Sequence, residues 1–288
     1  MQTRKLGRHD LHLSVLGFGG IVVTDRPQDE ADREVAAAID RGITYFDVAP
    51  QYGNAQERLG PALEPFRNRV ALACKTEQRT GPEAQAALDD SLIKLRTDYF
   101  DIYQLHAMTT PEDADLALAP GGALDVILKA RDAGKVHLVG FSAHDEATAL
   151  RLIETEQFDT VLYPLNFRQF EAGVFGPGVL EAATARGMGV MALKTMARAR
   201  VAEGDDPSYA KCWYHPEDRP EIAHLLLRYT LNLQGVTAAL PPGDPGLYRL
   251  ALDLAEDGLD PLSAEEKATL AAALPSPESA GMIFPHPA

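Results

Sequence analysis

The sequence predicts an α/β protein built as one (β/α)8 TIM barrel, in which eight parallel strands alternate with helices. Short apolar runs that end in polar residues alternate with longer amphipathic stretches, and there are eight such pairs. The length of 288 residues suits a single α/β barrel, and no Ser/Gly-rich or Pro-rich linker divides the chain. We therefore expect one domain over residues 1–288, with a hairpin at 1–12, the barrel at 13–256, and a helix with a tail at 257–288.

The expected strands are short, rich in Val, Ile, Leu and Phe, and bounded by Gly, Pro or charged residues. They cover residues 13–18, 43–48, 69–75, 99–105, 136–142, 160–165, 189–193 and 236–240. The expected helices follow them at 30–41, from 54 onward, 83–95, 123–133, 146–156, 178–186, 221–233 and 247–255, with one more at 263–274. Because the carboxyl ends of barrel strands meet on one face, polar residues just beyond several strands should converge there.

The composition excludes several classes of protein. The formal charge of −15 and the pI near 4.9 oppose a partner made of nucleic acid or anionic membrane, because most of the surface would repel it. No apolar run is long enough to span a membrane, and the first residues lack the apolar stretch of a signal peptide, so we expect a cytoplasmic protein. Cys74 and Cys212 stand far apart without metal-site spacing, and no metal is expected.

Four polar residues follow the second, third and fourth expected strands. Asp47 and Tyr52 lie at and beyond the end of the second, Lys75 ends the third, and His106 follows the fourth. A phenol can protonate a developing alkoxide, although its ordinary pKa near 10 makes it a slow acid at neutral pH. Lys75, kept charged by Asp47, could lower that pKa, while His106 could hydrogen-bond and orient a substrate carbonyl. The alternative is a buried ion pair beside a core histidine.

Five segments, three of which carry these residues, resemble the aldo-keto reductase family and its Asp/Tyr/Lys/His tetrad. They are Phe46-Asp47-Val-Ala-Pro-Gln-Tyr52-Gly53, Ala-Cys-Lys75-Thr, Tyr103-Gln-Leu-His106, Leu16-Gly-Phe-Gly-Gly20 and Val139-Gly-Phe-Ser142. The resemblance implies a (β/α)8 barrel that binds NADP(H), or less often NAD(H), in an extended form. In that family a hydride passes from the nicotinamide to an aldehyde or ketone, while the tyrosine supplies the proton.

The part of the chain that would hold the nicotinamide departs from the family pattern. The family asparagine after the fifth strand corresponds to Ala143, its strand-six glutamine to Leu162, and its stacking aromatic to Leu193. We therefore expect Ser142 and Asn166 to hold the carboxamide. The alternative for Asn166 is an ordinary loop cap.

The cofactor phosphates are expected near the ends of strands seven and eight, where barrels often bind phosphate. Lys194 and Arg198 follow strand seven, and the alternative for Arg198 is a solvated surface arginine. Arg249 aligns with the arginine that contacts the adenosine 2′-phosphate in the family, but Gly243 and Asp244 replace its lysine and serine. NADP(H) is the preferred cofactor and NAD(H) a possible one.

Ala192-Leu-Lys194-Thr-Met196 resembles a bacterial branch of the family, some longer members of which add an iron–sulfur domain whose cysteines this chain lacks. The complete set of expected cofactor contacts is Gly20, Asp47, Ser142, Asn166, Lys194, Met196, Arg198, Gly243 and Arg249.

The predicted function is NADP(H)-dependent reduction of an aldehyde or ketone to an alcohol, or the reverse, with Tyr52 as the proton donor. One alternative is a sensor or partner subunit that binds the nicotinamide nucleotide with little turnover. Another is an isomerase or aldolase that uses Lys75 as a Schiff base, although Asp47 should keep that lysine protonated. Partners other than the small carbonyl or alcohol substrate are not indicated.

Residues 196–219 form an unusually long connection for a barrel. We expect this segment, which carries Trp213 and a bend at 204–207, to be a lid over the cofactor or substrate. The alternative is a surface excursion whose aromatic residues pack on a helix or another subunit.

Overall fold

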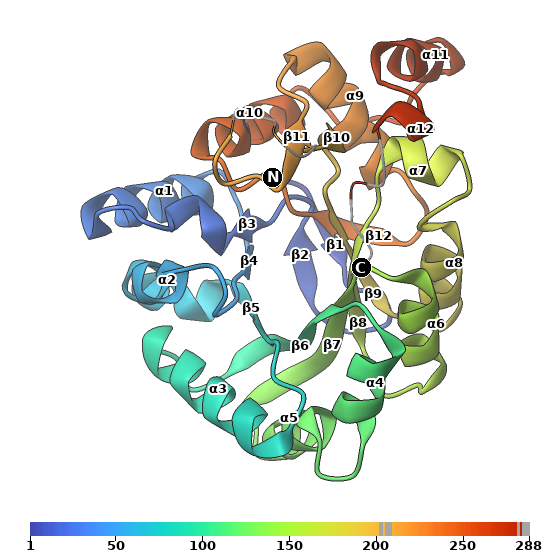
Figure 1. The fold of residues 1–288 in the computed structure, drawn as a ribbon. Coiled ribbons are helices and arrows are strands. Elements are labelled where there is room, and N and C mark those ends of the chain that lie inside the picture. The colour runs from blue at the N-terminus through green and yellow to red at the C-terminus, as the bar shows by residue number, and fades with distance from the viewer. Residues whose placement is uncertain (202–203, 205–208, 281–282, 284–288) are drawn as a thin grey trace.

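A single parallel sheet, curled into a barrel, forms the centre of the computed structural model, which describes residues 1–201, 204, 209–280 and 283 (Figure 1). Neighbouring strands follow one another along the chain. In order they are β3 (Phe18–Gly19), β4 (Tyr45–Asp47), β5 (Ala71–Thr76), β6 (Phe100–Met108), β7 (Val136–Ala143), β8 (Thr160–Pro164), β9 (Gly189–Leu193) and β12 (Val236–Ala239). The ring closes where Ala239 N donates to Val15 O and Gly17 N donates to Ala239 O, both at 2.9 Å. The predicted (β/α)8 barrel is confirmed.

Eight helices surround the strands and bury their apolar faces against the outside of the sheet (Figure 1). They are α1 (Gln28–Asp40), α2 (Ala55–Leu63), α3 (Gly81–Lys94), α5 (Ala123–Asp132), α6 (Glu146–Glu154), α8 (Pro177–Ala185), α9 (Pro220–Leu231) and α10 (Pro245–Glu256). Their bounds lie close to the predicted ones, because the helical spacing of apolar residues that predicts them is also what packs them on the sheet.

Short elements that the sequence did not predict fill several connections. They are the 3-10 helices η1 (Gly20–Val23) and η2 (Glu64–Arg69), and the helices α4 (Pro111–Leu118), α7 (Phe167–Glu171) and α12 (Pro277–Ala280). In α4, the Thr110 hydroxyl caps the helix by accepting from Asp113 N at 3.1 Å. The predicted C-terminal helix is α11 (Ala264–Ala273), which begins with a capping box formed by Ser263 and Glu266.

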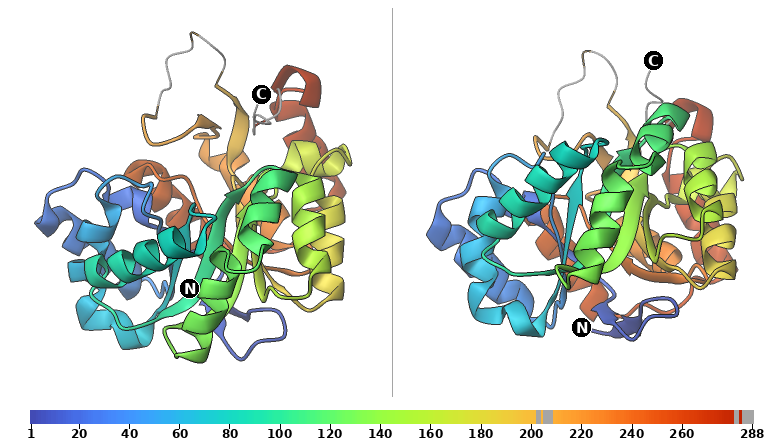
Figure 2. Two further views of the ribbon diagram at one scale, coloured as in Figure 1. Left: turned by 60° about the horizontal axis from the view of Figure 1, so that its bottom comes forward. Right: turned by 90° about the horizontal axis from the view of Figure 1, so that it is seen from below.

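The predicted first strand at 13–18 is divided between two elements. His12–Ser14 forms β2, which pairs antiparallel with β1 (Thr3–Lys5), and the barrel strand β3 begins at Phe18. Leu6 and Leu13 of the hairpin are buried against the interior of the barrel. The first half of the apolar run therefore closes the amino-terminal end of the barrel, and its last residue begins the barrel strand β3 (Figure 2).

At the opposite end, β10 (Ala197–Arg200) and β11 (Tyr214–Pro216) rise from the barrel as an antiparallel pair (Figure 2). The sequence analysis expected only a long connection over residues 196–219 and did not predict that two strands within it would pair. Of the expected bend at 204–207, positions 205–207 lie outside the described residues. No helix within the described part of the chain is long and apolar enough to cross a membrane.

Candidate active site

The four residues predicted as a tetrad lie together at the carboxyl ends of the strands. Asp47 ends β4, Lys75 is the penultimate residue of β5, His106 lies near the end of β6, and Tyr52 follows β4. A cavity of about 290 Å³ opens beside them. Its wall consists of Gln51, Tyr52, Lys75, Glu77, His106, Ala107, Ser142, His144, Leu162, Leu193, Lys194 and Trp213.

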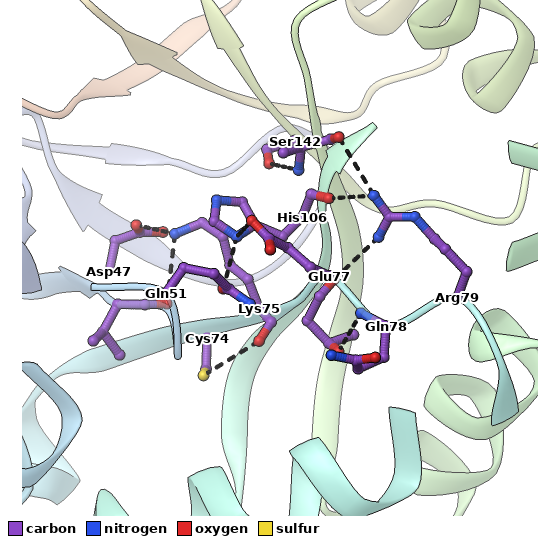
Figure 3. A network of polar contacts seen from close by, with 12 residues as sticks. Asp47, Gln51, Cys74, Lys75, Glu77, Gln78, Arg79, His106 and Ser142 are labelled. Carbon is purple, nitrogen blue, oxygen red and sulfur yellow. Dashed lines mark hydrogen bonds and ion pairs between the residues drawn. The ribbon is translucent and has the colours of Figure 1, made fainter. Parts of the chain in front are cut away.

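Lys75 and Asp47 form a buried ion pair behind this cavity (Figure 3). The ammonium also lies 3.5 Å from Val48 O, and the Tyr45 hydroxyl donates to the second Asp47 oxygen at 3.2 Å. Burial acts to lower the pKa of Lys75, but the negative charge of Asp47 and its hydrogen bond to the ammonium outweigh this effect and raise the pKa. Lys75 is therefore held as a cation, which opposes the alternative in which it forms a Schiff base.

Tyr52 is half-buried beside this cation. Its ring centre lies 5.3 Å from Lys75 Nζ, and its ring meets that of His106 edge-on at 6.0 Å. Desolvation raises the pKa of Tyr52, and the charge of Lys75 offsets only part of this effect. The expectation that Lys75 brings the pKa below its ordinary value is therefore wrong for the protein without ligand, because desolvation is the larger effect. The phenol is protonated at neutral pH, which is the state a proton donor needs.

His106 is held on one edge of its ring by two side chains that the sequence analysis missed. Its Nδ1 lies 3.1 Å from Gln51 Oε1 and 3.4 Å from Glu77 Oε1 (Figure 3). Arg79 fixes the backbone nearby by donating to His106 O at 2.7 Å. Burial, reinforced by the positive charge of Lys75, lowers the pKa of His106 well below its ordinary value, so the ring is neutral. Glu77 directly follows the end of β5, so the convergence of polar residues just beyond barrel strands could have identified it.

A second, smaller cavity adjoins the first and shares Tyr52, Leu193, Lys194 and Trp213 with it. Its remaining wall comes from the ends of β3, β4 and β12 and from the segment before β11. These residues are Gly19, Ile21, Asp47, Lys211, Tyr214, Leu240, Pro241, Pro242 and Gly243. The pair of cavities thus runs from the tetrad toward the ends of β9 and β12, where a phosphate site was expected.

Two lysines bring positive charge to the second cavity. Lys194, with a left-handed backbone φ of 58°, is largely enclosed, and burial lowers its pKa to about 7. Lys211, which the sequence analysis missed, donates to Val22 O at 3.1 Å and to Thr24 O at 2.7 Å. Its contacts tie the segment before β11 to η1, across the mouth of the barrel. No short motif marks Lys211, because its partners lie about 190 residues away in the sequence.

The structure places Ser142 and Asn166, the expected carboxamide ligands, in different surroundings. Ser142 lines the first cavity and accepts from Ala107 N at 2.9 Å. Asn166 is buried, caps α7 by accepting from Arg168 N at 3.1 Å, and donates to Ala197 O at 2.5 Å. It lines neither cavity, and its two hydrogen bonds are those of the capping alternative.

The other expected cofactor residues are divided between the cavity and its surroundings. Gly243 lines the second cavity, and a Cβ there would lie 2.0 Å from Ile21. Gly20 is buried against Val48, and Met196 is completely buried, so neither residue lines a cavity. Arg198 is exposed on β10. The expected contacts of Gly20, Met196 and Arg198 with a cofactor are therefore not supported by their positions.

Arg249 lies on the first turns of α10 and is engaged by a carboxylate. Its Nη1 is 2.7 Å from Glu34 of α1, and the Arg249 side chain is 56% exposed. Asp244 caps the same helix by accepting from Gly246 N at 2.8 Å and Leu247 N at 3.1 Å. A phosphate at this helix terminus would meet one arginine and one carboxylate.

Trp213 stands at the rim of both cavities. Its ring centre lies 6.3 Å from that of Tyr52, although 66% of the residue is exposed. The described part of residues 196–219 therefore reaches both cavities at Trp213, as a lid would require.

Comparison with known proteins gives matches along most of the chain. The sequence model of the Aldo/keto reductase family matches residues 15–243. An uncharacterized oxidoreductase YqkF of Bacillus subtilis is 34% identical over 40% of this chain and 42% of its own length. A 6-dehydroglucose reductase of Novosphingobium aromaticivorans is 29% identical over 69% of this chain and 70% of its own. The holo form of the aldo-keto reductase AKR11C1 from Bacillus halodurans has a TM-score of 0.72 and 23% identity, covering 96% of this chain and 97% of that chain, and shows the same fold.

Proposed function

The chain belongs to the aldo/keto reductase family, and from this premise we propose that it is an oxidoreductase that reduces an aldehyde or ketone to an alcohol, or catalyses the reverse, with a nicotinamide cofactor. The observation that carries the proposal is the buried ion pair of Lys75 and Asp47 directly behind Tyr52. A structural ion pair alone would not require a phenol at the wall of a cavity.

Tyr52 acts as the proton donor in this proposal. Its hydroxyl is protonated at neutral pH and lies at the cavity wall, so it can donate a hydrogen bond to the substrate carbonyl oxygen. The charge of Lys75 gains importance as the proton leaves, because an ammonium stabilises the phenolate that forms. Asp47 holds that ammonium in place. When bound, a dihydronicotinamide supplies the hydride that reduces the carbonyl carbon.

The residues of the second cavity fit a nicotinamide dinucleotide in their chemistry. Lys194 and Lys211 offer two cations for phosphates. In the adjoining first cavity, the Ser142 hydroxyl can still donate to a carboxamide after accepting from Ala107 N. The second cavity itself, at about 70 Å³, is too small for a dinucleotide. In the proposal Lys211 therefore exchanges the carbonyls of Val22 and Thr24 for a cofactor phosphate.

Arg249 supports a preference for NADP(H) over NAD(H). The Arg249 side chain in its ion pair with Glu34 is 56% exposed, although Glu34 is only 14% exposed, so solvent screens the pair and a 2′-phosphate can displace the carboxylate. Asp244 opposes the same phosphate with its own charge. The preference for NADP(H) is accordingly expected to be small.

A second candidate function is a nucleotide-binding sensor or partner subunit with little turnover. Leu162 and Leu193 favour it, since both line the first cavity where the family pattern has an amide and an aromatic residue. Binding of the nucleotide without reduction of any carbonyl would support this function.

The test is the Tyr52→Phe variant, measured with NADPH and NADH on a panel of aldehydes, ketones and sugars. The panel includes sugars because one relative is named 6-dehydroglucose reductase. Removal of the proton donor should lower turnover at least about a hundredfold and leave cofactor affinity, measured by calorimetry, nearly unchanged.

Tyr99→Phe is the matched control, because Tyr99 stacks on His137 outside the barrel mouth. It should retain the wild-type rate. A Tyr52→Phe enzyme as active as the wild type would overturn the proposed acid. A wild-type protein that binds the cofactor but reduces nothing in the panel would favour the sensor.

A further inference from the structure

A third cavity lies at the amino-terminal end of the barrel, between the turn of the β1–β2 hairpin and the carboxyl ends of α6 and α8 (Figure 2). Its volume is about 360 Å³. Met188 lines it and directly precedes β9, whose last residue, Leu193, lines the cavity beside the tetrad, so the two cavities lie at opposite ends of one strand. We call it the hairpin cavity, and its lining includes Arg8, Ile153, Glu156, Phe158, Arg186 and Met188.

Arg186 brings a guanidinium with unused donors to the hairpin cavity. Its Nε is fully buried and, among the residues that the structure describes, has no hydrogen-bond partner, while its Nη1 reaches only Ala182 O at 3.4 Å. Buried donors in native proteins nearly always have an acceptor, so Arg186 presents this edge to a group that enters the cavity. A carboxylate matches the edge, because its two oxygens accept from Nε and Nη2 in parallel.

Arg8 stands beside Arg186 and removes an obstacle to an anion. The carboxyl end of a helix repels negative charge through its free carbonyls. Here Arg8 Nη1 donates to Arg186 O at 2.9 Å, and Gly187 N donates to Thr184 O at 2.9 Å, so these carbonyls after and within α8 are already engaged. Arg8 Nη2 also lies 3.7 Å from Asp159, which balances part of its charge. The charge of Arg186 is left for a ligand.

Glu156 brings the opposite charge to the same cavity. It is exposed just beyond the end of α6, and within the described part of the chain its carboxylate forms no hydrogen bond or ion pair. Glu156 and Arg186 therefore line one cavity without pairing with each other. The carboxyl end of α6 adds partial negative charge near Glu156, which favours a cation at this position.

The floor of the hairpin cavity is apolar. Ile153, Phe158 and Met188 line it, and none of them is more than 3% exposed. A volume of about 360 Å³ admits an apolar group of the size of a leucine or phenylalanine side chain together with its charged groups. An inorganic anion would leave this floor uncovered, and Glu156 would repel a dianion.

We propose that the hairpin cavity binds an α-amino acid with an apolar side chain in its zwitterionic form. The carboxylate of the amino acid accepts from Arg186, its ammonium donates to Glu156, and its side chain covers Ile153, Phe158 and Met188. Binding there is independent of the proposed function, because an amino acid of this kind has no aldehyde or ketone group for the tetrad to reduce.

Three ligands with the same branched side chain test the two charges. L-Leucine carries both charged groups, 4-methylpentanoate lacks the ammonium, and 3-methylbutylamine lacks the carboxylate. We expect leucine to bind with a Kd of about 1 mM. Each of the other two should bind at least about tenfold more weakly, since each leaves one charged group of the cavity without a partner.

Met188 reports binding locally and without turnover. In protein labelled with ¹³C-methyl methionine, the Met188 signal is identified among those of the six methionines by its loss in Met188→Leu. This signal should shift saturably as leucine is added. The signal of Met108, which ends β6 at the other end of the barrel, should stay in place.

Two variants separate the contributions of the charges. Arg186→Gln should weaken the affinity for leucine at least about tenfold. Glu156→Gln should weaken it by a similar factor but should not weaken the affinity for 4-methylpentanoate, which has no ammonium. Arg131→Gln in the last turn of α5 and Glu154→Gln in the last turn of α6 are the matched controls. Both residues are exposed, neither lines the hairpin cavity, and neither substitution should change the affinity for leucine.

The outcomes are distinct. Equal affinities for leucine and 4-methylpentanoate would overturn the zwitterion, because Glu156 would then contribute nothing. A Met188 signal that stays in place at a leucine concentration about fiftyfold above the expected Kd would overturn the site itself. If Arg186→Gln does not fold, the three ligands still decide the matter in the wild type. A failure of the proposed function would leave all of these results unchanged, since none of them measures turnover.

Discussion

The two sides of the barrel mouth hold their polar groups in different ways. On the side formed by β4, β5 and β6, Asp47, Lys75 and His106 project from strand ends. Asp47 and Lys75 bond to residues on the same or the next strand, and His106 bonds to Gln51 in the loop after β4. On the side formed by β9 and β12, Lys194 has a left-handed backbone, and Lys211 bonds to carbonyls of a distant segment. The first side is assembled without a ligand, whereas in the proposed function the second side rearranges to admit the cofactor phosphates.

This difference predicts that the two sides fail in different ways. Changes near β4 and β5 should reduce turnover without altering cofactor affinity, because those residues act on the reacting atoms. Changes near β9 and β12 should alter cofactor affinity and leave turnover at saturation close to the wild-type rate. Two further predictions test this contrast, and a third concerns the choice of cofactor.

The largest effect is expected on the β5 side, from removal of the cation behind Tyr52. Lys75→Met alone would leave Asp47 as an unpaired buried charge and risk unfolding the protein. We therefore expect the double variant Asp47→Asn/Lys75→Met to fold and to lose about a hundredfold or more in turnover, because nothing then stabilises the Tyr52 phenolate.

Its cofactor affinity, measured by calorimetry, should stay close to that of the wild type. A variant that lost affinity and turnover together would show that the buried pair supports both sides of the mouth, and the contrast between them would fail.

The β4 to β6 side is also the part of the site that the sequence placed most fully. A strand end fixes the direction of its side chains, so a polar residue after an apolar run can be located from the fold class alone. Asp47, Lys75 and His106 satisfy this condition, and Tyr52 follows within a short loop. Gln51 and Glu77 were missed because their role appears only when His106 is placed between them.

The β9 to β12 side was less predictable for physical reasons. Asn166 follows a strand as the tetrad residues do, but its side chain caps α7 and bonds to Ala197, and nothing in the local sequence distinguishes these uses. The basic residues after strand seven were grouped as one cluster. In the structure, Lys194 precedes the strand pair of β10 and β11 and is largely enclosed. Arg198 lies within β10 and is exposed.

The next effect concerns Lys194 and pH. Burial lowers its pKa to about 7 in the protein without cofactor, whereas a bound phosphate favours the charged form and raises that pKa. Cofactor affinity should therefore be highest below pH 7 and weaken as the pH rises from the lower pKa to the higher one. We expect a loss of about tenfold between pH 7 and pH 9, measured by calorimetry.

NADH is the suitable ligand for this measurement, because it lacks the 2′-phosphate, whose own second ionisation near pH 6 would complicate the profile. Lys194→Arg should bind NADH with the same affinity across this range, since arginine stays charged, and Lys194→Met should bind it weakly throughout. A wild-type affinity that is independent of pH would place the phosphates away from Lys194.

The smallest effect is expected from Arg249. This residue should change the affinity for NADPH relative to NADH, and it does not test the contrast between the two sides of the mouth. A charge-assisted contact with phosphate contributes about 1.5–3 kcal/mol, but Arg249 is 56% exposed and must first leave Glu34, so the lower end of that range applies. Arg249→Ala should weaken the affinity for NADPH about tenfold and leave the affinity for NADH nearly unchanged.

Glu34→Gln should strengthen the affinity for NADPH severalfold, because it frees the guanidinium of Arg249. Arg33→Ala, which breaks a more exposed pair with Asp29 on α1, is the control and should change neither affinity. Equal losses for both cofactors in Arg249→Ala would show that this arginine only joins α10 to α1, and the small preference for NADP(H) would then lose its physical basis.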